Sequence, residues 1–175
     1  LVNKKYPPSE NSMHIALSYV KLNKLREEKY YQAKAAGYKL VSYISSKATF
    51  WSDLSVGDNC FILEDQTIQP NVKIGNNVML WCGNHVGHGS VIGDHTYLAS
   101  HVVISGNCRI GLRCFFGVNS TLKDFTIIGD DVFVAMDASV TKDLPSHSVV
   151  LGAKSRIFEP DDLVGQKIKN LYFKL

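Results

Sequence analysis

The sequence predicts a mainly β protein whose central domain is a left-handed parallel β-helix of hexapeptide repeats. Between residues 44 and 140 a large aliphatic or aromatic residue returns at every sixth position, with no step missed. A second, mostly small residue stands four places after many of them. The large residues are Ile44, Phe50, Val56, Ile62, Ile68, Ile74, Leu80, Val86, Ile92, Leu98, Ile104, Ile110, Phe116, Leu122, Ile128, Val134 and Val140.

A period of six needs its own explanation, because apolar residues return at about 3.6 in a helix and at 2 in a strand. It fits a short strand that points two side chains inward and then turns a corner. Three such sides close a triangular coil of about 18 residues, and successive coils stack about 4.8 Å apart. So long an unbroken run predicts a β-helix over residues 44–157, with large side chains in the centre and small ones near the corners.

The segment before the repeats, residues 1–43, has the pattern of a partial α/β domain. Ile15 to Val20 is predicted as a strand, and residues 23–36 as a helix capped by Asn23 and ended by Gly37. Residues 39–44 then form a short strand leading into the coil. There is no Gly-rich phosphate loop before the helix, so the segment is interpreted as the later part of such a domain.

The segment after the repeats, residues 158–175, predicts a helical tail that begins at Pro160. We expect its apolar side to pack on the prism or on a neighbouring subunit. That side consists of Leu163, Val164, Ile168, Leu171 and Tyr172.

Composition and charge exclude several classes of protein. No apolar run approaches the ~20 residues that cross a bilayer, and the start lacks a signal pattern, so a cytoplasmic location is expected. Residues 1–43 hold 8 Lys/Arg and 3 Asp/Glu, a net charge of +5, whereas the whole chain has a net charge of +3. They lack a basic stripe with interleaved aromatics, which argues against nucleic acid. Cys60, Cys108 and Cys114 fall on small inward positions and are interpreted as packing residues.

The stretch from Asn84 to Ser120, NHVGHGSVIGDHTYLASHVVISGNCRIGLRCFFGVNS, resembles the core of the bacterial sugar acyltransferases. These include the sialic acid O-acetyltransferases and the N-acetyltransferases of nucleotide-linked amino sugars. Residues 23–44 are similar to the end of that family's sugar-nucleotide-binding domain, and residues 149–157 to its end-of-coil segment. The resemblance implies a homotrimer that binds acetyl-CoA in a cleft between two prisms, with a corner histidine, His88, as the catalytic base.

The position of His88 in its hexad is consistent with that role. It is a corner residue pointing out of the prism, and the residues 18 away in a regular coil are Pro70 and Gly106. Acyl transfer needs a base for the incoming amine or hydroxyl and an N–H for the developing oxyanion. We expect His88 to be the base and the Gly106 N–H to be that donor. Imidazole ionises near pH 6.5, so it is mostly neutral in the cytoplasm.

Further site residues are predicted around this pair. Asn119 and three histidines, His85, His95 and His101, are expected to line the same cleft and to bind substrate or to orient His88. The orienting group is open, because the family usually follows its base with Asp or Glu and this chain has Gly89.

The coenzyme is expected along the later coils. Gly106 and Val118 are predicted near its reactive end, and Gly152, Lys154 and Arg156 near its nucleotide end. Met136 and Asp137 stand where the family favours glycines, and they would narrow the wall beside the pantetheine arm.

The sequence therefore predicts an acetyl-CoA-dependent transferase acting on the amine of a nucleotide-linked amino sugar, in bacterial surface-glycan biosynthesis. Transfer to a sugar hydroxyl and a non-catalytic trimeric scaffold remain alternatives. A zinc-dependent carbonic anhydrase of the γ type is disfavoured, because His95 and His101 are six residues apart and so fall on successive faces. No metal is expected.

Overall fold

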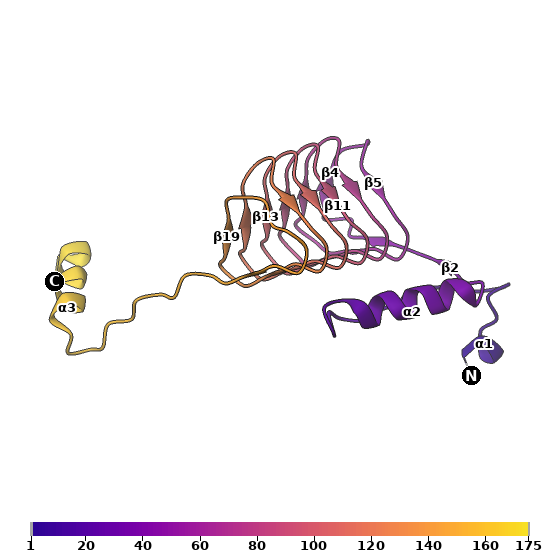
Figure 1. Ribbon diagram of the computed structural model, residues 1–175, viewed down its shortest axis with the longest axis horizontal. Helices are drawn as coiled ribbons and strands as arrows, with labels where there is room; N and C mark the ends of the chain where they lie inside the picture. The colour runs from indigo at the N-terminus through magenta and orange to yellow at the C-terminus, as the bar shows by residue number, and fades with distance from the viewer. Residues whose placement is uncertain (1, 175) are drawn as a thin grey trace.

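The computed structural model describes residues 2–174 and confirms the predicted left-handed parallel β-helix (Figure 1). Every strand of the coil has two residues, and the strands stack into three flat faces. The seven-stranded face holds β3 (Tyr43–Ile44), β6 (Phe61–Ile62), β9 (Met79–Leu80), β12 (Tyr97–Leu98), β15 (Phe115–Phe116), β18 (Phe133–Val134) and β20 (Val149–Val150). The six-stranded face holds β4 (Thr49–Phe50), β7 (Thr67–Ile68), β10 (His85–Val86), β13 (Val103–Ile104), β16 (Thr121–Leu122) and β19 (Ser139–Val140). The five-stranded face holds β5 (Ser55–Val56), β8 (Lys73–Ile74), β11 (Val91–Ile92), β14 (Arg109–Ile110) and β17 (Ile127–Ile128).

Strands pair in parallel with residues 18 positions away, as His85 does with Val103, so each coil takes 18 residues. Only the last coil is shorter. There β18 pairs with β20 at a spacing of 16, Phe133 against Val149.

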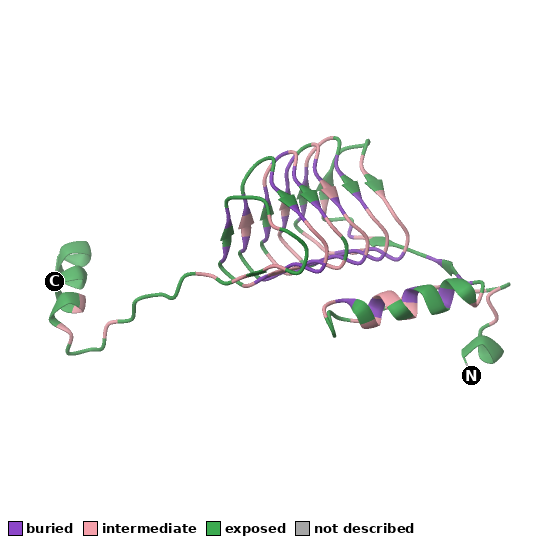
Figure 2. Ribbon diagram, viewed as in Figure 1, coloured by how far each residue is buried: buried purple, intermediate pink, exposed green. Residues whose placement is uncertain are grey.

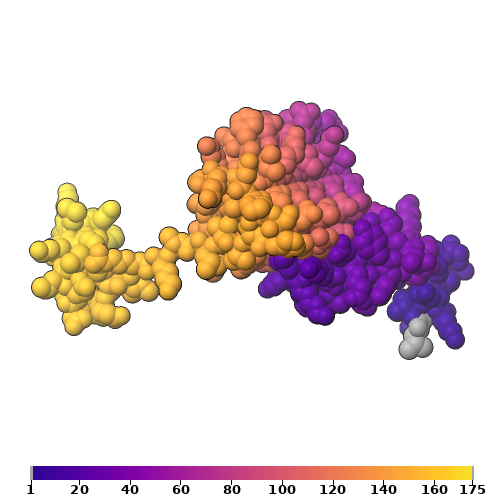
Figure 3. Space-filling view, viewed as in Figure 1, coloured from indigo at the N-terminus to yellow at the C-terminus, as the bar shows by residue number. Residues whose placement is uncertain are grey.

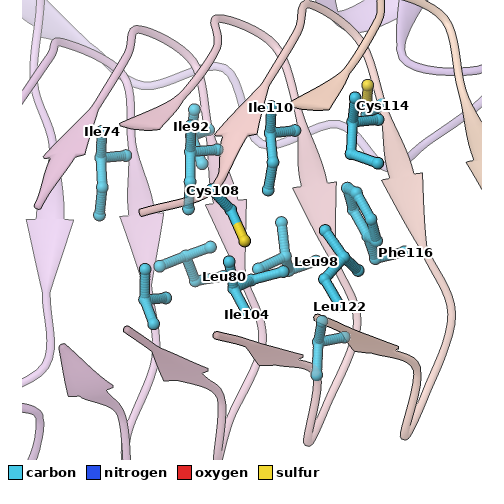
Figure 4. Close-up of a cluster of buried hydrophobic side chains, with 14 of the residues drawn as sticks. Ile74, Leu80, Ile92, Leu98, Ile104, Cys108, Ile110, Cys114, Phe116 and Leu122 are labelled. Carbon is cyan, nitrogen blue, oxygen red and sulfur yellow. The ribbon is translucent and has the colours of Figure 1, made fainter. Parts of the chain in front are cut away.

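All of the hexad residues except Phe50 form one continuous core inside the prism, where most of them are completely buried (Figure 4). Phe50 was predicted to point inward, but in this first coil it is 44% exposed, so that prediction was wrong. Cys60, Cys108 and Cys114 are buried among them, which confirms their role in packing. Burial raises the pKa of the Cys60 and Cys114 thiols to about 11, so neither is a thiolate near neutral pH.

The three corners of the prism run the length of the coil, and each carries one of the singled-out histidines. The His88 corner, residues 87–90 and their equivalents in other coils, joins the six-stranded face to the five-stranded face. The His95 corner, residues 93–96, joins the five-stranded face to the seven-stranded face. The His101 corner, residues 99–102, joins the seven-stranded face to the six-stranded face.

The N-terminal segment differs from its prediction in part. It contains α1 (Val2–Lys5), β1 (Ser12–Met13), α2 (Lys24–Ala35) and β2 (Lys39–Leu40), and β1 pairs with β2 in parallel. Residues 15–20 are not a strand but an extended stretch along the coil, so that prediction was wrong. Helix α2 does end at Gly37, whose φ of +90° is one that a side chain disfavours.

The predicted cap on α2 is also wrong, because Asn23 is used for a tertiary contact instead. Its φ is +64° and its side chain makes no capping hydrogen bond. Asn23 Nδ2 donates to the carbonyl oxygens of Arg113 (3.2 Å) and Cys114 (3.0 Å). The side chain therefore fixes the start of α2 to the His95 corner.

The C-terminal helix α3 (Leu163–Phe173) begins after Asp162, whose carboxylate accepts from the N–H groups of Val164 and Gly165. None of its residues is buried, and the helix stands apart from the prism at the end of an irregular segment (Figures 1 and 3). The expected packing on the prism is thus absent within the described residues of one chain, since residues 151–161 form no pairing that returns the helix to the coil. Among residues 2–174, each helix is too short or too polar to cross a membrane.

Candidate active site

His88 lies where the repeat predicts, exposed on its corner and seated over Gly106. A methyl group placed on Gly106 would stand 2.7 Å from Cε1 and 2.8 Å from Nε2 of the imidazole. The ring therefore occupies the space that a side chain at 106 would need. Glycine at 106 leaves room for the imidazole against the next coil, and His88 lies beside Gly106 as predicted.

The group that holds His88 is Gln69, which the sequence analysis did not find. Gln69 Oε1 lies 2.9 Å from the backbone N of His88 and 3.0 Å from its Nδ1. Gln69 is 19 residues before His88. The residue that stacks directly beneath His88, 18 positions earlier, is Pro70, so Gln69 is its immediate neighbour. The signal in the sequence is that Gln69 is an amide at the same corner one coil earlier, and the structure shows it half-buried.

The N–H of Gly106, expected to be the oxyanion donor, has a partner in this structure. It donates to Asp124 Oδ1 at 3.2 Å, from the next coil of the same corner. The same type of bond recurs at the His95 corner, where the N–H of Leu112 donates to Asp130 Oδ1 at 2.8 Å. At both corners, an Asp carboxylate thus accepts a hydrogen bond from the backbone N–H of the residue 18 positions earlier, and this bond helps to join successive coils.

His95 is not in the cleft, contrary to the prediction. It is 1% exposed and lies beneath α2, whose Tyr30 and Tyr31 meet its ring edge to face. Asn77 Nδ2 lies 2.8 Å from its Nδ1, and Glu27 Oε1 lies 3.6 Å from its Nε2. Burial lowers the pKa of His95, with Glu27 partly opposing that shift. His95 is therefore a docking residue for α2, which lies along the prism and turns its buried residues towards it (Figure 2).

A buried arginine completes that docking. Arg26 is 1% exposed, and its Nη2 donates to the carbonyl oxygen of His95 at 2.7 Å. Burial lowers its pKa to about 10. Arg113 adds an ion pair with Glu27 at 3.0 Å.

The other predicted residues lie away from His88 within one chain. His101 and Asn119 are exposed on the His101 corner, one coil apart, and His85 is half-buried on the outer side of the six-stranded face. No hydrogen bond joins His88 to His85 or His101 among residues 2–174, so neither orients the imidazole here. The side chain that contacts the His88 imidazole is Gln69, and not a second histidine as expected.

The predicted coenzyme residues divide between two corners. Gly106 belongs to the His88 corner, while Val118 and Gly152 belong to the His101 corner, where Gly152 lies against the backbone of Met136. Lys154 and Arg156 follow in the irregular segment and are exposed. Within one chain these residues do not form a single binding surface.

A groove of about 580 Å³ lies beside the His101 corner, on the seven-stranded face. Four of its ten lining residues are aromatic, and Tyr19 packs across the Tyr97 and Phe115 rings at 5.1 and 4.8 Å. Predicted residues at its edge are Val118 and Met136, the latter 63% exposed. The full lining is Ser18, Tyr19, Trp81, Tyr97, Ala99, Ser100, Phe115, Gly117, Val118 and Met136.

The described residues offer no cluster of three or more His, Cys, Asp or Glu side chains that could hold a metal ion. His95 and His101, considered for a zinc site, stand on different corners of the prism.

Comparison with known proteins agrees with this architecture. The family model described as "Bacterial transferase hexapeptide (six repeats)" matches residues 71–106. The acetyltransferase domain of PglB from Neisseria gonorrhoeae FA1090 is similar with a TM-score of 0.82 and 21% identity, over 90% of this chain and 76% of that chain. PerB from Caulobacter crescentus, solved with CoA and GDP-perosamine, gives 0.80 and 22% over 90% and 73%. WeeI from Acinetobacter baumannii AYE gives 0.72 and 25% over 78% and 66%.

No curated protein sequence matches the chain. By the family model, residues 71–106 carry hexapeptide repeats of the bacterial transferase type. Its fold is the one shared by the PglB acetyltransferase domain and PerB, as expected from the resemblance of residues 84–120.

Proposed function

We propose that this chain is an acetyl-CoA-dependent acetyltransferase that acts on the amine of a nucleotide-linked amino sugar, in the cytoplasmic steps of bacterial surface-glycan biosynthesis. The observation that carries the proposal is the His88 corner, where an exposed imidazole is held by Gln69 and seated on a glycine. PerB, whose fold this chain shares, was solved with CoA and a nucleotide-linked amino sugar, which supports this substrate class.

His88 acts as the base in this reaction. The amine of the sugar attacks the thioester carbonyl carbon, and the C–S bond then breaks to release the coenzyme as a thiolate, which takes up the proton that His88 has accepted from the amine. His88 Nε2, which faces Gly106, takes the proton that the amine loses. Such a positioned base contributes roughly 10²–10⁴ to the rate.

The oxyanion that forms on the carbonyl oxygen needs an N–H donor. We assign the N–H of Gly106 to it, next to the base on the same corner. Since that N–H donates to Asp124 at 3.2 Å in this structure, the carbonyl oxygen must displace the Asp124 carboxylate to reach it.

The groove on the seven-stranded face is the place we assign to the donor. Its apolar walls suit the pantetheine arm, with Val118 near the reactive end and Gly152 further along the corner. Lys154 and Arg156 are exposed beyond Gly152 and are assigned to the coenzyme phosphates, although Arg156 lies over the Phe158 ring at 4.6 Å in this structure. Acetyl-CoA supplies the activated acetyl group as a thioester.

A homotrimer unites these parts. The His88 corner and the groove lie at different edges of one prism, so a single chain cannot bring Nε2 to a donor in its own groove. In the trimer that we propose, three prisms pack about a common axis with the His88 corner of one chain beside the groove of the next.

The test is mass spectrometry of the protein incubated with acetyl-CoA and a panel of nucleotide-linked 3-amino and 4-amino sugars. A product heavier by one acetyl group, formed by the wild type and not by His88→Ala, is the expected result. If acetyl transfer occurred only to sugars that offer a hydroxyl group, the protein would be an O-acetyltransferase and the proposed amine acceptor would be wrong. Failure to bind acetyl-CoA would make the protein a scaffold instead.

A further inference from the structure

We propose that Gln69 is the positioning residue of His88, fixing the imidazole as the tautomer that leaves Nε2 free to accept a proton. The inference rests on the proposed acyl transfer and names the group that replaces the acidic residue missing at Gly89. It follows from two contacts that share one oxygen atom.

The first contact sets the orientation of the Gln69 amide. The backbone N of His88 is always a donor, and it lies 2.9 Å from the Gln69 side chain. The atom that it meets must therefore be the acceptor oxygen, Oε1, and not the amide nitrogen.

The second contact sets the tautomer. His88 Nδ1 lies 3.0 Å from the same Oε1. Because a carbonyl oxygen only accepts, Nδ1 must carry the proton, and neutral His88 then has its lone pair on Nε2. In water a free imidazole side chain favours the opposite tautomer, so Gln69 imposes a preference that the corner would not otherwise have.

Gly89 explains why the acceptor comes from the preceding coil. Its φ is +66°, and a Cβ there would stand 2.5 Å from Asn107 Oδ1. An acidic side chain directly after His88 would thus be strained and crowded at this corner. Gln69 reaches the imidazole from the preceding coil, where its Oε1 lies 3.0 Å from Nδ1.

A neutral amide also differs from a carboxylate in its effect on charge. Asp in a serine protease triad both holds the tautomer and stabilises the imidazolium. Gln69 can do the first and contributes little to the second, because it carries no charge. Gln69 therefore orients the base without placing a charge beside it.

Three substitutions separate these effects. Gln69→Ala removes the acceptor, and kcat should fall roughly 10- to 100-fold with little change in KM for acetyl-CoA. Gln69→Glu keeps the acceptor and adds charge, so the rising limb of the pH profile of kcat/KM should move up by about one pH unit while the maximal rate is retained. Lys123→Ala, at the equivalent position three coils later, is the matched control and should keep the wild-type rate and profile.

A readout independent of activity is the ¹⁵N NMR spectrum of histidine-labelled trimer, with the His88 signals identified by their loss in His88→Ala. We expect the Nδ1–H tautomer in the wild type and in Gln69→Glu, and a return to the Nε2–H form in Gln69→Ala. An unchanged tautomer in Gln69→Ala overturns the proposal. A changed tautomer with full kcat removes Gln69 from the mechanism, whereas the expected tautomers in a protein with no transferase activity refute the proposed function instead.

Discussion

At the scale of single residues, the proposed chemistry depends on a position without a side chain. The imidazole of His88 fills the space above Gly106, and the backbone there has an ordinary φ that alanine could also adopt. An added methyl group would therefore act on the ring and not on the fold. This makes Gly106 a sharper probe of the site than a residue whose loss unfolds the prism.

Gly106→Ala should lower kcat at least ten-fold, because a methyl group 2.7 Å from Cε1 must push the imidazole away from its seat. Thermal unfolding should change little, since the displaced ring is exposed. Steady-state kinetics and a melting curve on the same sample check both. Ser105→Ala, the neighbouring residue, is the control. Full activity in Gly106→Ala would show that the seat of the ring does not matter.

His88→Ala should reduce kcat by roughly 10²–10⁴ while leaving coenzyme binding nearly intact. The His88 side chain is exposed and makes few core contacts, so its removal should lower the rate of the chemical step and not the stability of the fold. Calorimetric titration with CoA beside a rate measurement separates the two effects. The exposed His147→Ala serves for comparison. If His88→Ala were as active as wild type and His101→Ala inactive, the base would be on the other corner.

At the scale of elements, the six-residue repeat predicted the coil because each large residue packs on the residues 18 positions before and after it. That local rule placed His88 over Gly106 correctly. It could not predict that α2 covers one corner, which depends on contacts such as Asn23 with Cys114, 91 positions apart. His95 was therefore assigned to a cleft when it lies beneath a helix.

Gln69 was missed for a related reason. The stacking rule names residues 18 positions apart, and the contact with His88 spans 19, through a side chain whose direction the repeat does not fix. Likewise, the shortened last coil and the extended path of residues 15–20 follow from packing that no period expresses.

The docking of α2 should weaken in acid. The pKa of His95 is lowered from 6.5 by burial, so the unfolded chain takes up a proton first as the pH falls. Stability is therefore retained above about pH 6.5 and lost as the pH falls below it towards the depressed folded pKa. Denaturant titrations at pH 7.5 and 5.0 should show this loss in the wild type.

His95→Asn should flatten that dependence. Asparagine already occupies the equivalent left-handed position at Asn77 and cannot take up a proton. His147→Asn is a matched control, because His147 has the same backbone conformation but is exposed. An equal acid sensitivity in wild type and His95→Asn would mean that His95 does not link α2 docking to pH.

At the scale of the whole molecule, the prism separates the parts that the proposed reaction must bring together. One corner holds His88, the proposed base, and the groove assigned to the donor lies beside another corner. Trp51 and Trp81 are 46% and 43% exposed, and the apolar side of α3 is uncovered, so one chain leaves much apolar surface in water. Packing between chains would cover part of it and would complete the site.

A shared site can be tested by mixing two inactive variants. His88→Ala lacks the base, and Val118→Trp fills the groove with a ring at a position that is already 39% exposed. Each alone should form trimers, with a mass three times 19.4 kDa by light scattering, and each should be nearly inactive. After co-expression, roughly a quarter of the interfaces should pair an intact His88 from one chain with an intact groove from the next. The mixture should therefore recover roughly a quarter of the wild-type activity, by that same count of interfaces. Trimers that mix without recovering activity would mean that each chain holds a complete site, and a monomer at micromolar concentration would rule out sharing altogether.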